Sequence, residues 1–323
     1  MTFLMNTSDL KNIFPELKTG VKLGELATFG VGGVAKHLLM VTSSEDLVEV
    51  IKEAGKNRVP YLVFAGGSNM VFSDEPSDIL YICYRTNEKK ADVIRITENT
   101  IKVEAGLPLS FLINQAVKAG LGGLEALSGI PGTVGGAVVG NAGAYGQSIS
   151  DKLTAVEIFD GQETKSLSKT ECDFKYRDSA LKKSRDLLVL SATFNLEPDD
   201  KEELEKTSTK IIEVRNKKYQ PGLLCPGSFF KNVLIKDVKK ESLKFIPEKV
   251  IIDGKIPAGF LLEAVEAKGL KEGGVEVADF HGNLIFNTGA GKFTDVIKLS
   301  TELKKRVKDK FDINLEEEVR LVE

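Results

Sequence analysis

Glycines crowd residues 120–146, and they are the first feature of this chain that could do chemistry. The stretch holds ten of the 30 glycines and a single charged residue, Glu125. Glycine allows positive φ angles and lets main-chain N–H groups come close to a bound molecule. Because so many glycines cost conformational entropy on folding, we expect one of two structures. Either a flat aromatic cofactor lies on this bare backbone, or the glycines form tight turns over a packed core.

A second glycine segment, AGGSN at 65–69, directly follows the apolar run YLVF, which is typical of a buried strand. Successive main-chain N–H groups in such a segment can surround a pyrophosphate, in the arrangement called a nest. The groups concerned belong to Gly66, Gly67, Ser68 and Asn69. A strand that ends in two glycines is also common without a ligand, so this segment alone leaves both interpretations open.

The motifs of two common nucleotide-binding folds are missing from the sequence. No GxGxxG motif opens a βαβ unit, and no GxxxxGK[ST] motif occurs. A Rossmann dinucleotide site and a P-loop are therefore disfavoured. Any nucleotide cofactor of this chain is expected to bind through another fold.

Histidines and cysteines are too sparse and too scattered to predict a metal site. The three cysteines, Cys83, Cys172 and Cys225, lack CxxC spacing and do not suggest a disulfide framework. We expect them to be reduced packing residues. His37 and His281 do not form a ligand pair, and no HExxH motif is present, so we expect structural histidines and no metal.

Composition and charge describe an ordinary globular protein. Of the 323 residues, 42% are hydrophobic and 28% charged, which argues against long disordered stretches. The net charge is −3 and the basic residues are spread along the chain, so no nucleic-acid surface is predicted. No apolar run approaches the ~20 residues that span a bilayer, and the N-terminal residues do not resemble a secretory signal. We expect a cytoplasmic protein without membrane or nucleic-acid partners.

Residues 28–196 show the pattern of a mixed α/β unit made of two lobes. A helix is predicted at 43–57, because Ser43 and Asp46 can form a capping box before apolar residues at helical spacing. A second helix is predicted from about Pro108, in the first turn, to Ala119. Alternating or apolar runs predict strands at 61–64, 93–97, 101–105, 154–159 and 187–196, of which the second and third form a hairpin.

The pattern changes after residue 196, where we place a second domain. Helices are predicted at 199–219, 257–268 and 292–310, a strand-like stretch at 275–287, and a last strand at 313–322. On that last strand, alternation puts Glu316, Glu318 and Arg320 on one face, which is polar enough to line a site. The other face carries Leu315, Glu317, Val319 and Leu321.

Six segments occur in an order that resembles one known family. They are TFGVGG (28–33), AGGSNMVFSD (65–74), SGIPGTVGGAVVGNAGAYG (128–146), CDFKYRDS (172–179), PGSFFKN (226–232) and LEEEVRLV (315–322). The chain resembles the UDP-N-acetylenolpyruvoylglucosamine reductase family from about residue 20 to residue 322. This combination is far more specific than any single glycine motif.

The resemblance implies an α/β (α+β) fold with a two-lobed FAD-binding domain of the p-cresol methylhydroxylase type. The lobes would comprise 1–84 and 85–196, followed by a C-terminal α/β substrate-binding domain at 197–323. The strand at 313–322 would return to the active site. The chain resembles the shorter branch of the family, which lacks a substrate-covering insertion.

The family reduces UDP-N-acetylglucosamine enolpyruvate to UDP-N-acetylmuramate for peptidoglycan precursors. NADPH reduces a non-covalently bound FAD, hydride then passes to the enolpyruvyl methylene carbon, and the neighbouring carbon is protonated. The resemblance implies that Ser228 of GSFFKN is the proton donor. It also implies catalytic roles for Arg177 of YRDS and for Glu318, which precedes Val319 and Arg320.

The chemistry of that reaction suits these residue types. Hydride addition beta to a carboxylate builds negative charge on it, and an arginine can bind that charge through two hydrogen bonds worth roughly 1.5–3 kcal/mol each. A serine need not ionise in advance, because the carbon that takes its proton is strongly basic. Lys231 could hold the developing alkoxide. Glu318 would either stabilise the enol or hold Arg177 in place, and the sequence leaves both roles open.

The resemblance also implies binding residues. For FAD they are Ala65, Gly66, Gly67, Ser68, Asn69, Met70, Gly129, Thr133, Gly135, Gly136, Asn141, Ala142 and Ala144. For the substrate they are Tyr176, Arg215, Lys218, Lys231, Asn232 and Asn283, where RNKK at 215–218 resembles the family's diphosphate contact. Two positions depart from the family pattern, since Glu317 replaces the proline of EPEVR and Val233 stands where proline often follows GSFFKN.

Two alternatives compete with this prediction. An FAD-dependent sugar or hydroxy-acid oxidase or dehydrogenase of the same fold is one, although many of those tether FAD through a histidine near the nucleotide-binding glycines. This chain has Ser68 there and no histidine between His37 and His281. A non-catalytic FAD- or nucleotide-binding module is the other, and retention of all three catalytic positions disfavours it. We expect a monomer whose partners are small molecules, the UDP-sugar and NADPH.

Overall fold

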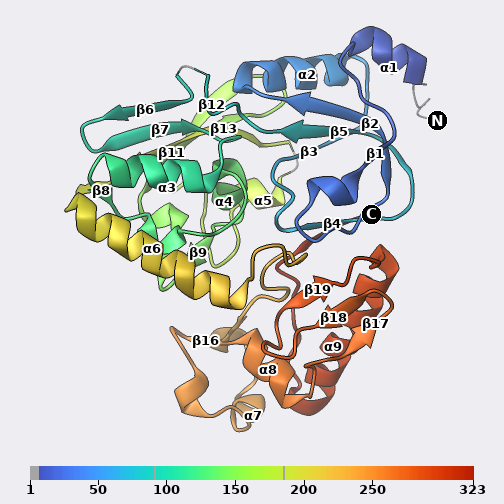
Figure 1. Cartoon of the computed structure of the whole chain (residues 1–323), viewed down its shortest axis with the longest axis vertical. Coiled ribbons are helices and arrows are strands. Elements are labelled where there is room, and N and C mark those ends of the chain that lie inside the picture. Colours follow the sequence, from blue (N-terminus) through green and yellow to red (C-terminus); the bar gives the residue numbers. More distant parts are fainter. Residues whose placement is uncertain (1–6, 91, 185) are drawn as a thin grey trace. The chain divides into compact units, whose positions relative to one another are not determined.

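The computed structural model describes residues 7–90, 92–184 and 186–323 (Figure 1). Contacts divide the chain into two compact units, each discontinuous in sequence. The first unit comprises Met1–Val21, Ala35–Gly66 and Ser77–Lys217, and the second comprises Lys22–Val34, Gly67–Pro76 and Lys218–Glu323. The sequence predicts boundaries after residues 84 and 196, between two FAD-binding lobes and a substrate-binding domain. These boundaries stay a prediction.

A four-stranded sheet, covered by α2 (Ser44–Lys56), forms one half of the first unit (Figure 1). Its strands lie in the order β1-β2-β5-β3, with β5 parallel to β2 and β3. They are β1 (Val21–Lys22), β2 (Val34–Val41), β3 (Tyr61–Phe64) and β5 (Ser77–Tyr84). The predicted capping of α2 is confirmed, because Ser43 Oγ accepts a hydrogen bond from the N–H of Asp46 at 3.2 Å. The buried face of α2 carries Leu47, Ile51 and Ala54, as their helical spacing predicted.

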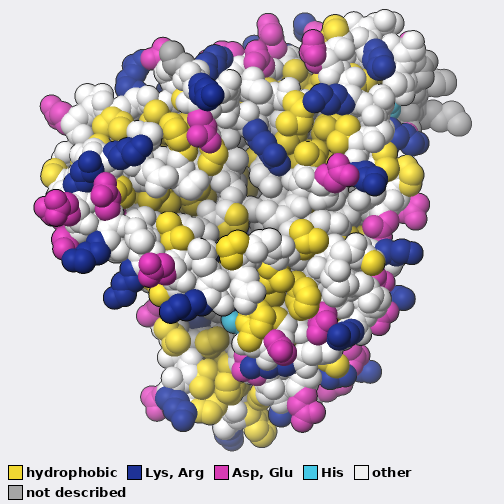
Figure 2. All heavy atoms as spheres, viewed as in Figure 1, with side chains coloured by type: hydrophobic (Ala, Val, Ile, Leu, Met, Phe, Trp, Pro, Cys, Tyr) yellow, Lys and Arg dark blue, Asp and Glu magenta, His cyan; other side chains and the backbone are white. Residues whose placement is uncertain are grey.

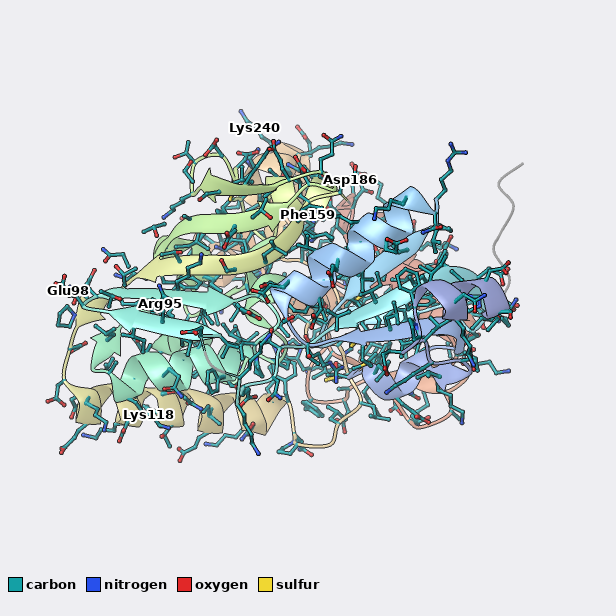
Figure 3. All side chains as sticks on the ribbon, turned by 90° about the horizontal axis from the view of Figure 1, so that it is seen from above. Arg95, Glu98, Lys118, Phe159, Asp186 and Lys240 are labelled. Atoms are coloured by element: carbon teal, nitrogen blue, oxygen red, sulfur yellow. The ribbon has the colours of Figure 1, made fainter. Side chains whose placement is uncertain are left out.

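A five-stranded antiparallel sheet forms the other half of the first unit. The strand order is β12-β11-β13-β7-β6, with β6 (Ile94–Thr97), β7 (Thr100–Glu104), β11 (Leu153–Phe159), β12 (Thr164–Ser168) and β13 (Leu188–Asn195). The predicted hairpin is confirmed by the pairing of β6 with β7. Figure 3 labels Phe159 where α2 meets this sheet, and Lys52 Nζ lies 5.6 Å from its ring centroid. One continuous apolar core joins both sheets.

Short elements complete the first unit and present its glycine-rich segments. The helices are α1 (Thr7–Ile13), α3 (Leu109–Lys118), α4 (Val134–Val139), α5 (Ala180–Lys183), α6 (Lys201–Lys218) and the 3₁₀ turns Glu125–Leu127 and Ile149–Asp151. The strands are β8 (Leu121–Gly122), β9 (Gly143–Ala144), β10 (Gln147–Ser148) and β14 (Glu197–Pro198). Helix α4 packs in the same core as α3, so the glycines around it lie at the edge of a buried layer.

The second unit is built around the long helix α9 (Phe293–Phe311). Its apolar residues Val296, Leu299 and Leu303 share a core with α8 and β18. The other helices are α7 (Lys240–Leu243), α8 (Ala258–Ala264) and the 3₁₀ turns Leu23–Leu26, Ile235–Asp237 and Glu248–Val250. The strands are β4 (Met70–Phe72), β15 (Val233–Leu234), β16 (Lys255–Ile256), β17 (Lys271–Glu272), β18 (Val275–Val277), β19 (Ile285–Asn287) and β20 (Arg320–Val322). Parallel pairing of β20 with β4 joins the C-terminal strand to the segment after AGGSN.

Five local expectations were wrong in detail. Pro108 is the N-cap of α3 and not a first-turn residue, and strand β3 is half-buried except at Phe64. The stretch 275–287 is two short strands joined by a turn, and the helix expected at 257–268 ends at Ala264. The strand expected at 313–322 is reduced to β20, because residues before it pair with the GSFFKN segment through only a few backbone hydrogen bonds.

Surface and thiol properties add little specific chemistry. In Figure 2, acidic and basic side chains are interspersed over the visible face. Among the described helices, none combines the length and apolar character needed to cross a membrane. The described residues contain no cluster of His, Cys, Asp and Glu suited to a metal ion. All three cysteines are buried free thiols, and burial raises the pKa of Cys172 to about 11.

Candidate active site

Arg177 is held against the NAGAYG segment of the first unit. Its Nη2 donates to the carbonyl of Gly143 at 2.6 Å, and its Nη1 donates to the carbonyl of Asn141 at 3.4 Å. The backbone of Arg177 has φ 54°, in the left-handed region that few side chains adopt. The guanidinium carbon lies 5.4 Å from the ring centroid of Tyr176. A predicted catalytic residue and predicted FAD-binding residues are thus brought together across 34 positions of sequence.

Two further hydrogen bonds tie the YRDS turn to the same segment. Ser179 Oγ donates to the carbonyl of Val139 at 2.8 Å, and Asn141 Nδ2 donates to the carbonyl of Lys175 at 2.8 Å. The other amide atom, Asn141 Oδ1, is buried and meets no donor among the residues that the structure describes. Buried acceptors without a partner are rare. An additional donor from a bound molecule, such as a flavin ring N–H, fits this position.

The glycines of 129–146 have more than one structural reason. A Cβ on Gly135 would lie 2.9 Å from Ala105 Cβ, and a Cβ on Gly143 would lie 2.5 Å from the carbonyl oxygen of Gln147. Those two glycines are required by packing, as the turn-and-core alternative expected. Gly136 is different, because it is exposed and its Cβ would meet only Thr133 Oγ1 at 3.5 Å, an ordinary contact. Bare backbone there is available to a flat ligand.

Gly67, in the AGGSN segment, belongs to the second unit. It has φ +59°, and a Cβ on it would lie 2.5 Å from the carbonyl oxygen of Leu26. Gly67 is buried, and no backbone carbonyl of the described residues accepts from its N–H. Its own carbonyl accepts from Thr28 N at 3.3 Å, and Thr28 Oγ1 donates to the carbonyls of Ser68 and Cys225. An N–H without a backbone partner in a glycine turn fits a pyrophosphate oxygen.

The remaining predicted FAD-binding residues lie beside these features. The carbonyl of Ala65 accepts from Arg85 Nε at 3.2 Å, and a Cβ on Gly66 would lie 3.0 Å from Gly132 Cα. Thr133 caps α4, while Gly129 has φ +75° and lies beside the Arg215 side chain. Met70 begins β4, and Ala142 and Ala144 belong to or adjoin the NAGAYG hairpin. The structure therefore distributes these residues over both units.

Ser228 and Glu318 lie on neighbouring segments of the second unit. The N–H of Glu318 donates to the carbonyl of Phe229 at 2.8 Å, and the N–H of Lys231 donates to the carbonyl of Glu316 at 2.9 Å. Asn69 joins the same region, since its Nδ2 donates to the carbonyl of Glu318 at 2.9 Å. Two predicted catalytic residues about 90 positions apart are brought together by backbone pairing, and a predicted FAD-binding residue lies against them.

Glu317 anchors this terminal segment from the opposite face. Its carboxylate accepts from Ser300 Oγ at 2.7 Å and from Lys304 Nζ at 3.0 Å, both on α9. Burial alone would raise the pKa of Glu317, but these hydrogen bonds outweigh it and lower the pKa. The predicted alternation is confirmed, because Leu315 and Val319 are buried on the Glu317 face while Glu316 and Arg320 are exposed.

The predicted substrate-binding residues differ in their surroundings. Lys231 Nζ pairs with Glu316 at 3.0 Å, and Asn232 Oδ1 accepts from the N–H of Ala258 at the start of α8. Asn283 is buried, and its amide exchanges two 2.8 Å hydrogen bonds with the backbone of Phe230. Asn283 thus supports the GSFFKN segment, and its contact with substrate stays a prediction. Lys218 Nζ lies 4.9 Å from the ring centroid of Tyr219.

Tyr219 was not predicted as a site residue from the sequence. Tyr219 places its hydroxyl 3.0 Å from Ser228 Oγ. The only signal in the sequence was its position directly after RNKK, which does not specify a partner. Thr28, which binds AGGSN, was likewise quoted only as part of a motif.

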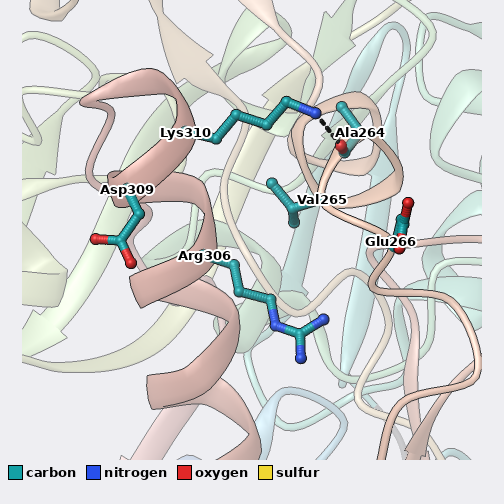
Figure 4. A pocket seen from close by; sticks show the side chains of 6 residues that line it. All are labelled: Ala264, Val265, Glu266, Arg306, Asp309 and Lys310. Carbon is teal, nitrogen blue, oxygen red and sulfur yellow. Dashed lines mark hydrogen bonds between the residues drawn. The ribbon is translucent and has the colours of Figure 1, made fainter.

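Two surface depressions of the second unit differ in their relation to the site. One lies between the end of α8 and the last turns of α9 (Figure 4), where Lys310 Nζ donates to the carbonyl of Ala264 at 2.6 Å. Its lining residues are Ala264, Val265, Glu266, Arg306, Asp309 and Lys310, none of which is a predicted site residue. The other includes Gly30, Gly32 and Leu224, close in sequence to Thr28 and Cys225.

Comparisons with known proteins define first the class and then the family. Residues 35–165 match a family model described as an FAD binding domain, and residues 220–322 match one described as the C-terminal domain of UDP-N-acetylenolpyruvoylglucosamine reductase. The fold is therefore that of a flavoprotein with an added C-terminal domain, and the mixed α/β class is confirmed.

Similarity to curated proteins extends over nearly the whole chain. UDP-N-acetylenolpyruvoylglucosamine reductase of Solibacter usitatus is 38% identical over 98% of this chain and 100% of its own length. The enzyme of the same name from Chloroherpeton thalassium is 34% identical over 99% and 97%. The crystal structure of the Thermus caldophilus enzyme matches with a TM-score of 0.73 and 31% identity, covering 95% of this chain and all of that one. The chain belongs to the UDP-N-acetylenolpyruvoylglucosamine reductase family.

Proposed function

We propose that this protein reduces UDP-N-acetylglucosamine enolpyruvate to UDP-N-acetylmuramate, with NADPH as the hydride donor, in peptidoglycan precursor synthesis. The observation that carries the proposal is the pairing of the GSFFKN segment with the terminal segment, which sets Ser228 beside Glu318 in a chain of this family. Bound FAD would supply the means to accept hydride from NADPH and deliver it to the substrate. We further expect a monomeric, cytoplasmic enzyme.

The residues that would hold FAD are those with a structural fit to it. The Oδ1 of Asn141 is a buried acceptor that the described residues leave unused, and the N–H of Gly67 has no backbone acceptor among them. Gly136 offers exposed backbone without a steric need for glycine. Together these features support the predicted set 65–70 and 129–144 as the cofactor-binding residues.

Ser228 and Arg177 would do the chemistry on the substrate. Ser228 would donate its hydroxyl proton to the carbon next to the carboxylate, while Arg177 would stabilise the negative charge that develops on that carboxylate. Because Arg177 already uses its guanidinium to bind the NAGAYG backbone, its orientation is set before substrate arrives. Glu318 would stabilise the enol or hold Arg177 in place. Arg215 and Lys218 would bind the diphosphate, and Tyr176, Lys231, Asn232 and Asn283 would position the rest of the substrate.

Anaerobic half-reactions test this proposal. The purified protein should be yellow, should lose its flavin absorption when NADPH is added, and should regain it when UDP-N-acetylglucosamine enolpyruvate follows. A colourless protein would exclude an FAD enzyme. Reduced flavin that reacts with oxygen but ignores the enolpyruvyl substrate would instead favour the oxidase alternative.

A further inference from the structure

The hydroxyl of Tyr219 forms the one side-chain hydrogen bond that the structure specifies for Ser228. The two oxygens lie 3.0 Å apart, and both residues belong to the second unit. Both side chains are half-buried, so the contact is neither solvated on all sides nor sealed in the core. Tyr219 directly follows the end of α6 and precedes Ser228 by nine positions. The proposed proton donor therefore has a second ionisable hydroxyl within direct reach.

Packing holds the Tyr219 ring in place. The ring lies against a small apolar cluster that includes the buried residues Cys225, Ala278 and Leu284. Lys218 Nζ lies 4.9 Å from the ring centroid, so a positive charge faces the ring. A cation in this position is attracted to the face of the aromatic ring. The Tyr219 hydroxyl is therefore positioned by the apolar cluster and by this contact.

We propose that Tyr219 is a positioning residue that acts through Ser228 and replaces the proton that Ser228 donates. This inference rests on the proposed function. As the C–H bond forms at the substrate carbon, the O–H bond of Ser228 breaks and its electron pair stays on Oγ. Oγ then takes the proton of Tyr219, and the resulting phenolate takes a proton from a water molecule, which leaves hydroxide in the solvent. In the net reaction, one proton moves from water to the product, and both side chains return to their neutral forms.

The need for such a partner follows from the chemistry of serine. A serine that gives up its proton becomes an alkoxide. This strongly basic anion is unfavourable unless a hydrogen bond or a proton reaches it at once. The nearby imidazole of His281 is a weak substitute as a proton source. Burial, followed by the charge of Lys218, lowers the pKa of His281 to about 4, so that its ring is neutral and only weakly acidic near pH 7. Lys231 Nζ is paired with Glu316.

The test is a double-mutant cycle on Tyr219→Phe and Ser228→Ala, measured in each half-reaction of the flavin-loaded enzyme. Tyr219→Phe keeps the ring in its apolar cluster and removes only the hydroxyl. We expect NADPH to reduce the flavin at the parent rate, and the reaction of reduced flavin with the enolpyruvyl substrate to slow by roughly 10- to 100-fold, the range of one hydrogen bond to a charged group. KM for the substrate should stay within about twofold, since the hydroxyl acts on the transition state alone.

The cycle separates this inference from the proposed function. In the Ser228→Ala background, Tyr219→Phe should have no further effect, because its partner is gone. Tyr61→Phe removes a half-buried hydroxyl of the first unit and should leave both half-reactions unchanged. Additive effects, equal slowing of both half-reactions, or a parent-like Tyr219→Phe would overturn the role of Tyr219 alone. A parent-like Ser228→Ala would overturn the proton-donor assignment, and the inference about Tyr219 with it.

Discussion

The region around Arg177 in the first unit and the region around Ser228 in the second hold their catalytic candidates by different means. Arg177 sits in a strained, left-handed turn, and carbonyl groups of a glycine segment orient its guanidinium. Ser228 and Glu318 lie on irregular segments that pair through a few backbone N–H and C=O groups. The arrangement around Arg177 depends on glycines, which have no side chain. The arrangement around Ser228 depends on backbone hydrogen bonds, which most residue types can form.

This difference predicts where each region tolerates change. The carbonyl oxygen of Gln147, 2.5 Å from where a Cβ on Gly143 would lie, leaves no room for that Cβ, so the first region should be sensitive to small additions. In the second region, Glu317 stands where the family pattern has proline. The neighbouring residues Glu316 and Glu318 make the backbone hydrogen bonds to the GSFFKN segment. The backbone pairing can therefore form with either glutamate or proline at position 317. Substitutions in the second region should be harmful mainly when they change the functional side chains themselves.

The largest effect is expected from Ser228→Ala. Loss of a general acid slows its step by roughly 10²- to 10⁴-fold, so reduced flavin should persist after the enolpyruvyl substrate is added. Stopped-flow absorbance of the two half-reactions measures this directly. Reduction by NADPH should be unchanged, and Ser166→Ala, an exposed serine on β12, is the matched control. Equal loss in both half-reactions would point to damaged folding instead.

Arg177→Lys should come next, with the enolpyruvyl half-reaction slowed by roughly 100-fold or more. Lysine keeps the charge but cannot bind Gly143 and Asn141 and also present a planar fork to a carboxylate. Arg95→Lys, on an exposed position of β6, is the matched control and should behave like the parent (Figure 3). Near-normal turnover of the Arg177→Lys protein would remove Arg177 from the mechanism.

Gly143→Ala tests the sensitivity of the first region without touching a functional side chain. The new Cβ would lie 2.5 Å from the carbonyl oxygen of Gln147 and 3.2 Å from Arg177 Nη1. We expect a loss of about 1–3 kcal/mol in the free energy of unfolding, together with slower turnover as Arg177 is displaced. Gly55→Ala in α2, where a Cβ meets nothing within 4 Å, should instead stabilise the protein by roughly 0.5–1 kcal/mol. Equal stabilities for the two variants would contradict the packing argument.

Glu317→Gln should have the smallest effect, on the order of 1 kcal/mol in unfolding free energy, because Lys304 is partly solvated. The folded-state pKa of Glu317 is lowered, so its contribution is present above the ordinary carboxyl value of about 4.3 and is lost as pH falls through the lower folded-state value. Urea unfolding at several pH values measures this. Parent and variant should converge at low pH, whereas Glu272→Gln, in an exposed pair with Lys298, should match the parent throughout.

Periodicity and capping residues predicted the scaffold well, because these signals are local. Ser43 caps α2 as expected, the β6–β7 hairpin forms, and α6 and α9 occupy the predicted stretches nearly residue for residue. The errors arose where tertiary pairing decides the outcome. Residues 313–319 alternate like a strand, but they find only scattered partners in the GSFFKN segment and form no continuous ladder.

By itself, the sequence determined the family, the fold class and the buried face of α2, because motif order and periodic spacing are properties of the chain. It also singled out Arg177, Ser228 and Glu318 as candidates. Only the tertiary structure divided the glycines between packing, as at Gly135, and open backbone, as at Gly136. It alone set Tyr219 beside Ser228 and Glu317 against α9. Such contacts join residues of different elements, and no periodic spacing in the sequence indicates them. They form only when the chain folds.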